Sequence, residues 1–194
     1  MTKIIGLTGG IGSGKTTIAN YIKSIGIPVY NADAEAKKIM HCPEIMQILK
    51  EQFGREIFDN NILNREKLSK IVFNNPEKLY QLNKIVHPAV KNHFDSWILE
   101  HNKFPIVFKE AAILFESGSY KYCDSVITVT SPLELRIQRV MQRDNTKREN
   151  VLSRINNQWT DEQRIGKSDH VIYNTTVKET YLQLDKILNL LKNQ

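Results

Sequence analysis

The sequence has little of what marks a secreted or membrane-bound chain. It holds two cysteines in 194 residues, Cys42 and Cys123, far apart and without the spacing of a metal site, so we expect free thiols in a reducing compartment. No apolar run is long enough to cross a bilayer. The opening apolar stretch, residues 4–7, is too short for a signal peptide. We therefore expect a cytoplasmic protein without a membrane partner.

Acidic residues are outnumbered by basic ones. The sequence has 27 Lys and Arg against 21 Asp and Glu, a formal net charge of +6, which favours anionic partners such as polyphosphate metabolites or nucleic acid. Basic residues concentrate between Arg136 and Lys167, where Trp159 is the one aromatic residue. Single-stranded nucleic acid is usually held by stacking on aromatic side chains, so the pattern argues against nucleic acid as the partner.

What the chain does have is a phosphate-binding pattern near its start. Residues 9–16 fit G-x-x-x-x-G-K-[ST], with an apolar run before them and a helical pattern after them. Glycines let successive N–H groups point at phosphate oxygens, and the helix N-terminus adds partial positive charge. We predict that Lys15 reaches the terminal phosphates of a nucleoside triphosphate and that the Thr16 hydroxyl joins the Mg²⁺ shell. The predicted nucleotide-binding residues are Gly10, Ile11, Gly12, Ser13, Gly14, Lys15, Thr16 and Thr17.

Short β-rich runs alternate with helical patterns along the chain. The runs mostly lack polar alternation, as expected for strands buried on both faces of a parallel sheet. Alternation with a P-loop in the first crossover predicts an α/β P-loop fold, a five-stranded parallel sheet flanked by helices. The predicted strands are Ile4–Leu7, Ile27–Tyr30, Ile106–Phe108, Val126–Thr130 and His170–Tyr173.

Two inserts interrupt the alternation. Residues 43–102 read as almost entirely helical, and residues 144–167 as polar, basic and helical. In small-molecule kinases inserts at these places supply an acceptor domain and a closing lid. We therefore expect a core of residues 1–42, 103–143 and 168–194, an acceptor-binding insert of 43–102 and a lid of 144–167. The oligomeric state does not follow from the sequence, and a monomer is our default expectation.

Two acidic residues follow predicted strands. Asp33 comes just after the second strand, where it either accepts a proton from an acceptor hydroxyl or caps the next helix. Asn31 is an equally good cap. Glu110 ends the third strand, as a Mg²⁺-associated acid or as a solvated carboxylate. Spacing alone leaves both pairs of alternatives open.

Basic residues and a histidine complete the candidates. Arg136, Arg139 and Arg143 share one helix face, and we favour Arg139 and Arg143 over Arg136 as groups that neutralise a transferred phosphoryl. Pro88 is expected to interrupt a long helix, because it lacks an N–H and crowds the preceding turn. His87 at this point either faces a cleft of the insert or is structural.

Taken in order along nearly the whole chain, these stretches resemble the dephospho-CoA kinase family. Arg65, the His87-Pro88 pair and Arg139-x-x-x-Arg143-Asp144 distinguish this resemblance from one to small kinases in general. The stretches that carry it are residues 6–17, 26–33, 63–68, 72–73, 82–88, 114–116, 138–144, Gln158 and 168–174.

The resemblance implies transfer of the ATP γ-phosphoryl, with Mg²⁺, to the ribose 3′-hydroxyl of dephospho-CoA. It implies that Asp33 is the base, that Arg65 and His87 bind the acceptor, and that Asn174 contacts adenine. It also implies that Arg139 and Arg143 bind phosphates.

The chain departs from the family pattern at two places. Asn31 replaces the first Asp of Asp-Ala-Asp, and Glu110-Ala111-Ala112 stands where Asp-x-Pro is common. The alternatives to this function are a kinase with another small acceptor, an ATP-binding regulatory module, and a nucleic-acid binder. A GTPase would need Asn-Lys-x-Asp, which the chain lacks.

Overall fold

The computed structural model describes residues 2–73 and 75–192, and it divides into two compact units. The first unit is Met1–Asn31 with Glu100–Gln194, and the second is Ala32–Leu99. Residues 32–42, which the sequence analysis groups with the core, fall in the second unit, where Met40 packs against the hydrophobic cluster. Residues 144–167 fall in the first unit.

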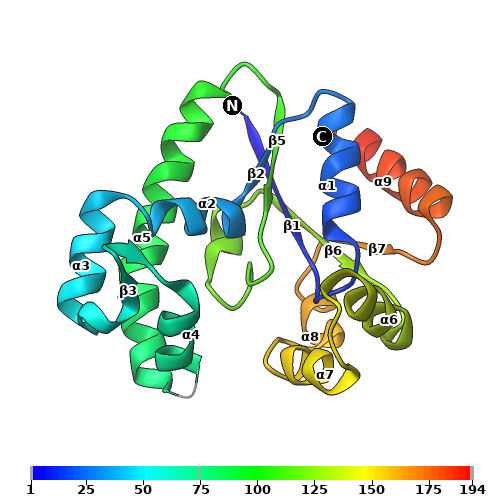
Figure 1. Cartoon of the computed structure of the whole chain (residues 1–194). Helices are drawn as coiled ribbons and strands as arrows, with labels where there is room; N and C mark the ends of the chain where they lie inside the picture. The colour runs from blue at the N-terminus through cyan, green and yellow to red at the C-terminus, as the bar shows by residue number, and fades with distance from the viewer. Residues whose placement is uncertain (1, 74, 193–194) are drawn as a thin grey trace. The chain divides into compact units, whose positions relative to one another are not determined.

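The first unit is built on a five-stranded parallel sheet, as predicted (Figure 1). The strand order is β2-β5-β1-β6-β7, so the strand that precedes the P-loop is central. The strands are β1 (Lys3–Thr8), β2 (Val29–Asn31), β5 (Ile106–Glu110), β6 (Ser125–Thr130) and β7 (His170–Tyr173). The helical elements of this unit are α1 (Lys15–Ser24), η2 (Ser119–Tyr122), α6 (Leu133–Asp144), α7 (Arg148–Asn156), α8 (Asp161–Ile165) and α9 (Val177–Lys192).

The core of the first unit lies between the sheet and the helices α1 and α9, which run side by side (Figure 1). Ile18 and Ile22 of α1 lie one turn apart on the same face and are fully buried. Leu184, Leu188 and Leu191 likewise lie about one turn apart on one face of α9 and are buried. A smaller cluster joins α6 to α7 through Ile137, Val140 and Val151. This packing fixes the start of α1, and therefore the end of the P-loop, against the central strand.

The second unit is helical apart from a short hairpin that the sequence reading missed. The strands β3 (Phe58–Asp59) and β4 (Ile62–Leu63) have two residues each. The turn that connects them consists of Asn60 and Asn61, which have φ of 48° and 63°. Asparagine tolerates these left-handed angles, which a two-residue hairpin turn requires. The helical elements are α2 (Ala32–Ile39), α3 (Pro43–Phe53), η1 (Arg55–Ile57), α4 (Arg65–Phe73) and α5 (Pro76–Glu100).

The expected interruption at Pro88 was wrong. Helix α5 runs continuously from Pro76 to Glu100 with Pro88 inside it. Proline removes one backbone hydrogen bond, and the burial of Val86 and Phe94 on either side holds the helix together across that loss.

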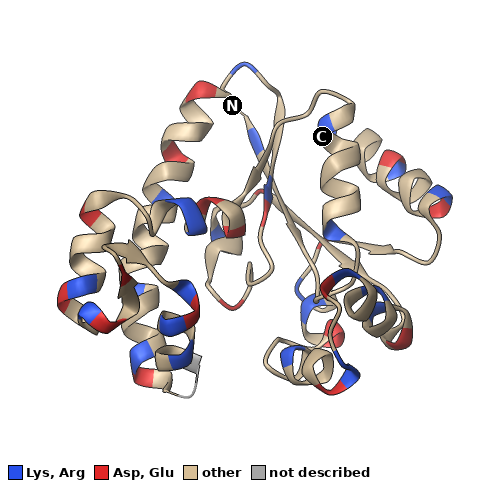
Figure 2. Cartoon of the chain, in the orientation of Figure 1, with Lys and Arg blue, Asp and Glu red and all other residues tan. Residues whose placement is uncertain are grey.

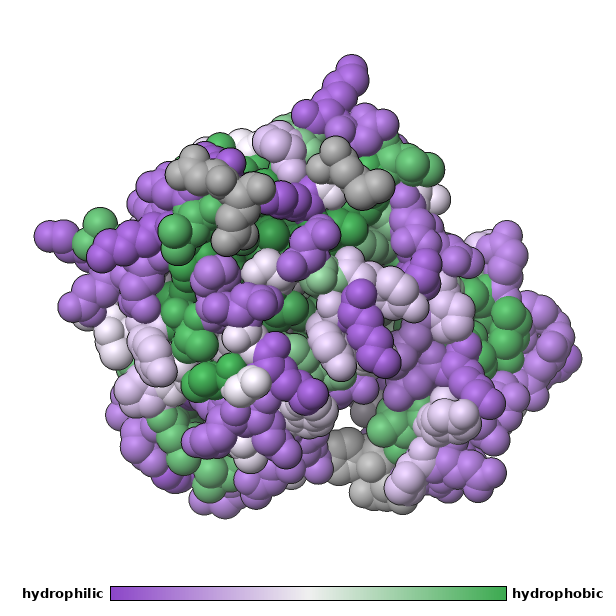
Figure 3. Space-filling view, turned by 180° about the vertical axis from the view of Figure 1, so that it is seen from behind, coloured by the Kyte–Doolittle hydropathy of each residue, from purple (hydrophilic) through white to green (hydrophobic). Residues whose placement is uncertain are grey.

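Basic and hydrophobic side chains are distributed over several parts of the surface. Basic residues lie at the start of α1 and along α6 and α7, as Figure 2 shows. On the face seen in Figure 3, hydrophobic side chains form separate groups between hydrophilic ones. Within residues 2–73 and 75–192 no helix is both long enough and apolar enough to span a bilayer.

Candidate functional site

The P-loop has the strand–loop–helix context that the sequence predicts. β1 ends at Thr8 and α1 begins at Lys15, and Gly9, Gly12 and Gly14 have φ of 152°, 78° and 95°. L-residues with side chains rarely adopt these angles, which explains glycine at these positions. Ser13 N donates to Gly10 O at 3.2 Å, which closes the loop on itself. The resulting turn leads directly into the positive end of α1.

A side chain at position 14 would also overlap with a neighbouring residue. A Cβ at this position would lie 1.9 Å from Nδ2 of Asn174. That amide is buried, donates to Ser13 O at 2.8 Å and accepts from Thr180 Oγ1 at 2.9 Å. The structure therefore shows Asn174 in contact with the P-loop backbone, and its predicted contact with adenine stays a prediction.

Gly14→Ala is expected to lower the free energy of unfolding by about 2–4 kcal/mol, since strain at positive φ is compounded by overlap with Asn174. Gly26→Ala is the matched control, because Gly26 has φ 82° but nothing within 4 Å of a Cβ, and should cost about 1 kcal/mol. Urea denaturation measures both. Equal losses for the two variants would mean that contact with Asn174 does not constrain Gly14.

Lys15, Thr16 and Thr17 form the first turn of α1. Nζ of Lys15 donates to Gly9 O at 2.6 Å, so the ammonium group lies over the loop that it follows. The side chain of Thr16 is exposed at the helix start. Mg²⁺ takes most of its oxygens from phosphates and water, so one hydroxyl at this point is a fitting protein ligand.

Two arginines of α6, Arg136 and Arg139, contact the P-loop, and of these the sequence analysis favours Arg139. Arg136 is buried, and its Nε donates to Ile11 O at 2.9 Å. Arg139 donates to Ser131 Oγ at 3.1 Å and lies 3.5 Å from Gly12 O. Arg143 is exposed and pairs with Asp144 at 2.7 Å, which raises the pKa of its guanidinium. The structure thus brings Arg136 and Arg139, but not Arg143, against the loop backbone.

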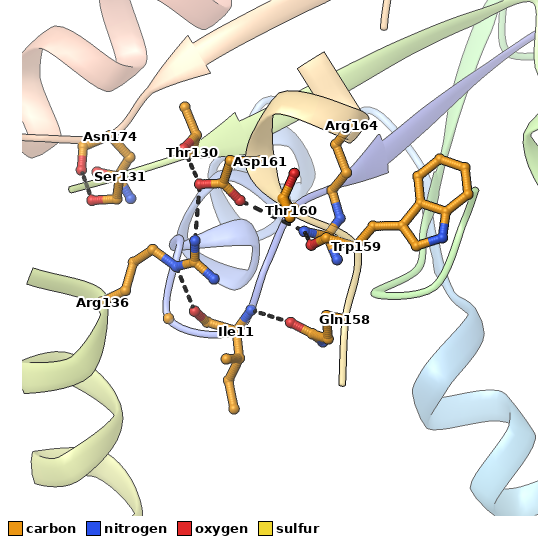
Figure 4. A network of polar contacts seen from close by, with 12 residues as sticks. Ile11, Thr130, Ser131, Arg136, Gln158, Trp159, Thr160, Asp161, Arg164 and Asn174 are labelled. Carbon is orange, nitrogen blue, oxygen red and sulfur yellow. Dashed lines mark hydrogen bonds and ion pairs between the residues drawn. The ribbon is translucent and has the colours of Figure 1, made fainter. Parts of the chain in front are cut away.

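Arg136 belongs to a set of charged residues that the sequence analysis did not single out as a site (Figure 4). Asp161 accepts from Arg136 Nη1 at 2.8 Å and from Thr130 Oγ1 at 2.5 Å. Arg164 is fully buried, and its Nη2 pairs with Glu116 at 3.1 Å. Burial lowers the pKa of the Arg164 guanidinium, and the Glu116 and Asp161 carboxylates act in the opposite direction.

Little in the sequence singled out this set. Glu116 fell within a stretch of the family resemblance, while Asp161 and Arg164 appeared as ordinary members of a charged, solvated segment.

Glu110 and Asn31 lie together at the carboxyl end of neighbouring strands. They are register partners of β5 and β2, and Asn31 Nδ2 donates to Glu110 Oε2 at 2.8 Å. Glu110 is buried, so its interpretation as a solvated carboxylate was wrong. Asn31 provides an amide hydrogen to this carboxylate, which an Asp at that position would not offer when ionised.

The predicted acceptor-side residues belong to the second unit. Asp33 lies in the first turn of α2, one residue inside the helix, so its interpretation as the N-cap was wrong. Arg65 is exposed at the start of α4. His87 is half-buried in the middle of α5, and burial lowers the pKa of its ring. Three different helices thus provide these side chains.

Comparison with known proteins decides the family. The sequence model of dephospho-CoA kinase matches residues 3–179. A dephospho-CoA kinase of Bacteroides fragilis is 37% identical over 188 residues, which is 96% of this chain and 92% of that protein. The chain belongs to the dephospho-CoA kinase family. It is therefore a kinase, an ATP-dependent phosphotransferase, and enzymes of this family use ATP with Mg²⁺.

Solved structures similar to this chain are consistent with its membership of the family. TT1252 from Thermus thermophilus superposes with a TM-score of 0.91 at 34% identity, covering 97% of each chain. A dephospho-CoA kinase from Campylobacter jejuni gives a TM-score of 0.71 at 28% identity, covering 100% of this chain and 99% of that one. A shikimate kinase from Acinetobacter baumannii, at 15% identity and a TM-score of 0.54, shares the fold alone. The fold is thus common to kinases with different acceptors.

Proposed function

We propose that this kinase transfers the γ-phosphoryl of ATP to the ribose 3′-hydroxyl of dephospho-CoA, giving CoA and ADP, the last step of coenzyme A biosynthesis. The observation that carries the proposal is the family match over residues 3–179, which includes both the P-loop and the second unit. We propose further that it acts in the cytoplasm as a monomer.

On the donor side the P-loop and the start of α1 bind ATP. Backbone N–H groups of the P-loop, among them those of Gly12 and Gly14, and the partial charge of the helix N-terminus bind the phosphates. Lys15 offsets charge on the terminal phosphates, and the Thr16 hydroxyl would be the protein ligand of Mg²⁺. When bound, the metal ion would supply positive charge that neutralises the charge developing on the phosphates.

On the acceptor side Asp33 carries out the proton transfer. The residue follows the end of β2 by two positions, and ligands of open α/β sheets gather at the carboxyl ends of strands. Its carboxylate aligns the 3′-hydroxyl and accepts the proton as the phosphoryl group moves.

Three further parts of the chain support the transfer in this proposal. Arg139, beside the loop, stabilises the transferred charge, and Arg143 does so by exchanging the Asp144 carboxylate for phosphate oxygens. Residues 144–167 act as a lid that excludes water, so that ATP is not hydrolysed instead. Residues 43–102 bind dephospho-CoA, with Arg65 and His87 as ligands.

Arg65→Ala is expected to raise the KM for dephospho-CoA about tenfold and the KM for ATP less than twofold, because a lost charge-assisted hydrogen bond affects the one substrate that accepts it. Steady-state kinetics with each substrate varied in turn measures the split. Lys70→Ala, which removes an exposed cation from the same helix α4, is the control. An equal rise for both substrates would count against Arg65 as an acceptor ligand.

The experiment that tests the function is ADP release from ATP and Mg²⁺ with dephospho-CoA, adenosine, AMP or shikimate as acceptor. We expect release that depends on dephospho-CoA, with CoA as the product. Dependence on another acceptor would indicate a different small-molecule kinase. ADP release that ignores all four, or ATP binding without release, would indicate a regulatory module and overturn the proposal.

A further inference from the structure

Ile11 of the P-loop is held by three separate contacts, all from the segment that follows β6. Its N–H donates to Gln158 Oε1 at 2.9 Å, and its C=O accepts from Arg136 Nε at 2.9 Å (Figure 4). Its side chain packs against the hydrophobic cluster of α6 and α7 that contains Val140 and Val151. Both backbone groups and the side chain of one loop residue are therefore engaged by other parts of the chain.

These contacts determine which way two peptide units face. In a trans peptide unit the C=O and the N–H point in opposite directions. Arg136 therefore orients the N–H of Gly12 by holding the C=O of Ile11. Gln158 likewise orients the C=O of Gly10, which accepts from Ser13 N inside the loop. Released from these contacts, the unit between Ile11 and Gly12 is free to flip, because glycine permits either orientation.

A flip at this place would turn a carbonyl oxygen toward the phosphates instead of an N–H. The carbonyl oxygen repels an anion and the N–H attracts it, so the orientation of a single peptide unit matters for phosphate binding. Gly12 has φ 78°, and a Cβ there would lie 2.5 Å from Arg136 O, so α6 packs directly against this unit. The site is therefore built to keep one orientation.

Asp161 holds Arg136 in place. Its Oδ2 accepts from Arg136 and Thr130, and its Oδ1 lies 3.6 Å from Arg164. Glu116 balances Arg164, so two buried guanidinium groups and two partly buried carboxylates form a neutral group. Removing the charge of Asp161 leaves the buried Arg136 guanidinium without its counter-ion, which is costly and favours another side-chain position.

We propose that Asp161 and Gln158 are positioning residues for ATP: acting through Arg136 and Ile11, they keep the Ile11–Gly12 peptide unit with its N–H toward the phosphates. The inference rests on the proposed function of the P-loop as the ATP site. By linkage, ATP must in turn stabilise the segment of residues 158–164 against the loop. Trp159 lies in that segment, donates its backbone N–H to Glu116 at 3.3 Å and stacks on Phe115, so its fluorescence should report the change.

The test uses a Trp97→Phe background, which leaves Trp159 as the one tryptophan. A non-hydrolysable ATP analogue is titrated without acceptor, and steady-state kinetics gives each KM. Asp161→Asn should weaken ATP binding about tenfold or more, the loss expected for a charged hydrogen bond. Gln158→Met should weaken it about fivefold, the loss expected for a neutral hydrogen bond, and should give a smaller fluorescence change than the parent. The KM for dephospho-CoA should stay within about twofold. Glu162→Gln, which neutralises the next, exposed acid of α8, is the matched control and should bind ATP normally.

The inference is overturned if Gln158→Met and Asp161→Asn bind the analogue as tightly as the parent, or if they weaken both substrates equally while lowering the melting temperature. Gln158→Met decides the matter if Asp161→Asn fails to fold, because it removes one hydrogen bond from a half-buried side chain. A parent chain that binds the analogue but does not phosphorylate dephospho-CoA refutes the proposed function and leaves this inference standing. A parent chain that does not bind the analogue refutes both.

Discussion

Asp33→Asn is expected to lower kcat about 10²–10⁴-fold with dephospho-CoA as acceptor, the range that removal of a general base gives. Asparagine keeps the size of the side chain but cannot accept the hydroxyl proton. Because Asp33 is proposed to act on the acceptor hydroxyl and not on ATP itself, the affinity for ATP should change less than about twofold. Quenched-flow or steady-state kinetics measures turnover, and analogue titration measures ATP affinity.

The matched control for this variant is Glu35→Gln. Glu35 lies two residues along the same helix and pairs with Lys38 at 2.8 Å on the surface, so the change removes one negative charge close to Asp33. A general loss of negative charge on α2 would slow both variants, whereas a specific base would slow Asp33→Asn alone. Near-normal turnover in Asp33→Asn would remove Asp33 from the mechanism.

The strands of the sheet were predictable because each is a short apolar run bounded by turn residues. His170–Tyr173 was predicted with the observed bounds, and β1 and β6 within one residue at each end. The prediction failed where local pattern is weak. The prediction for β2 began two residues too early and ended one residue too early. The strands β3 and β4 were missed, because two residues are too few for any periodicity to appear.

The loop of the site was predictable and its surroundings were not. The P-loop has a spacing fixed by the geometry of phosphate binding, so residues 9–16 identify themselves. Arg136 and Arg143 share one face of α6 but lie about two turns apart, so which of them meets the loop depends on where along its length α6 passes the loop. The sequence pattern favoured Arg139 and Arg143, of which Arg139 lies beside the loop and Arg143 is exposed beside Asp144.

Pairs distant in sequence were the least predictable part. Asn31 and Glu110 are 79 residues apart, and each departs from the family pattern separately, yet they are hydrogen-bonded across two strands. A single sequence gives no sign that two departures belong together, since their proximity follows from the parallel pairing of β2 with β5. The same holds for Arg136 and Asp161, which α7 separates along the chain.

Lys15→Met is expected to lower kcat about 10²–10³-fold and to weaken ATP binding as well, because one preorganised positive charge is removed from the phosphates of a site. Methionine keeps the length of the aliphatic chain, so the change is chiefly one of charge. Nζ of Lys15 donates to Gly9 O at 2.6 Å, which holds the ammonium over the loop before any reaction begins. Steady-state kinetics and analogue titration measure the two effects separately.

The control is Lys23→Met, which removes the same charge from an exposed position in the last turn of the same helix and should leave both parameters near normal. Lys15→Arg separates charge from geometry, because a planar guanidinium retains the charge but not the compact ammonium that the loop accommodates. We expect Lys15→Arg to recover part of the binding and little of the turnover. Turnover above about a tenth of normal in Lys15→Met would mean that the backbone N–H groups and Arg139 supply most of the stabilisation.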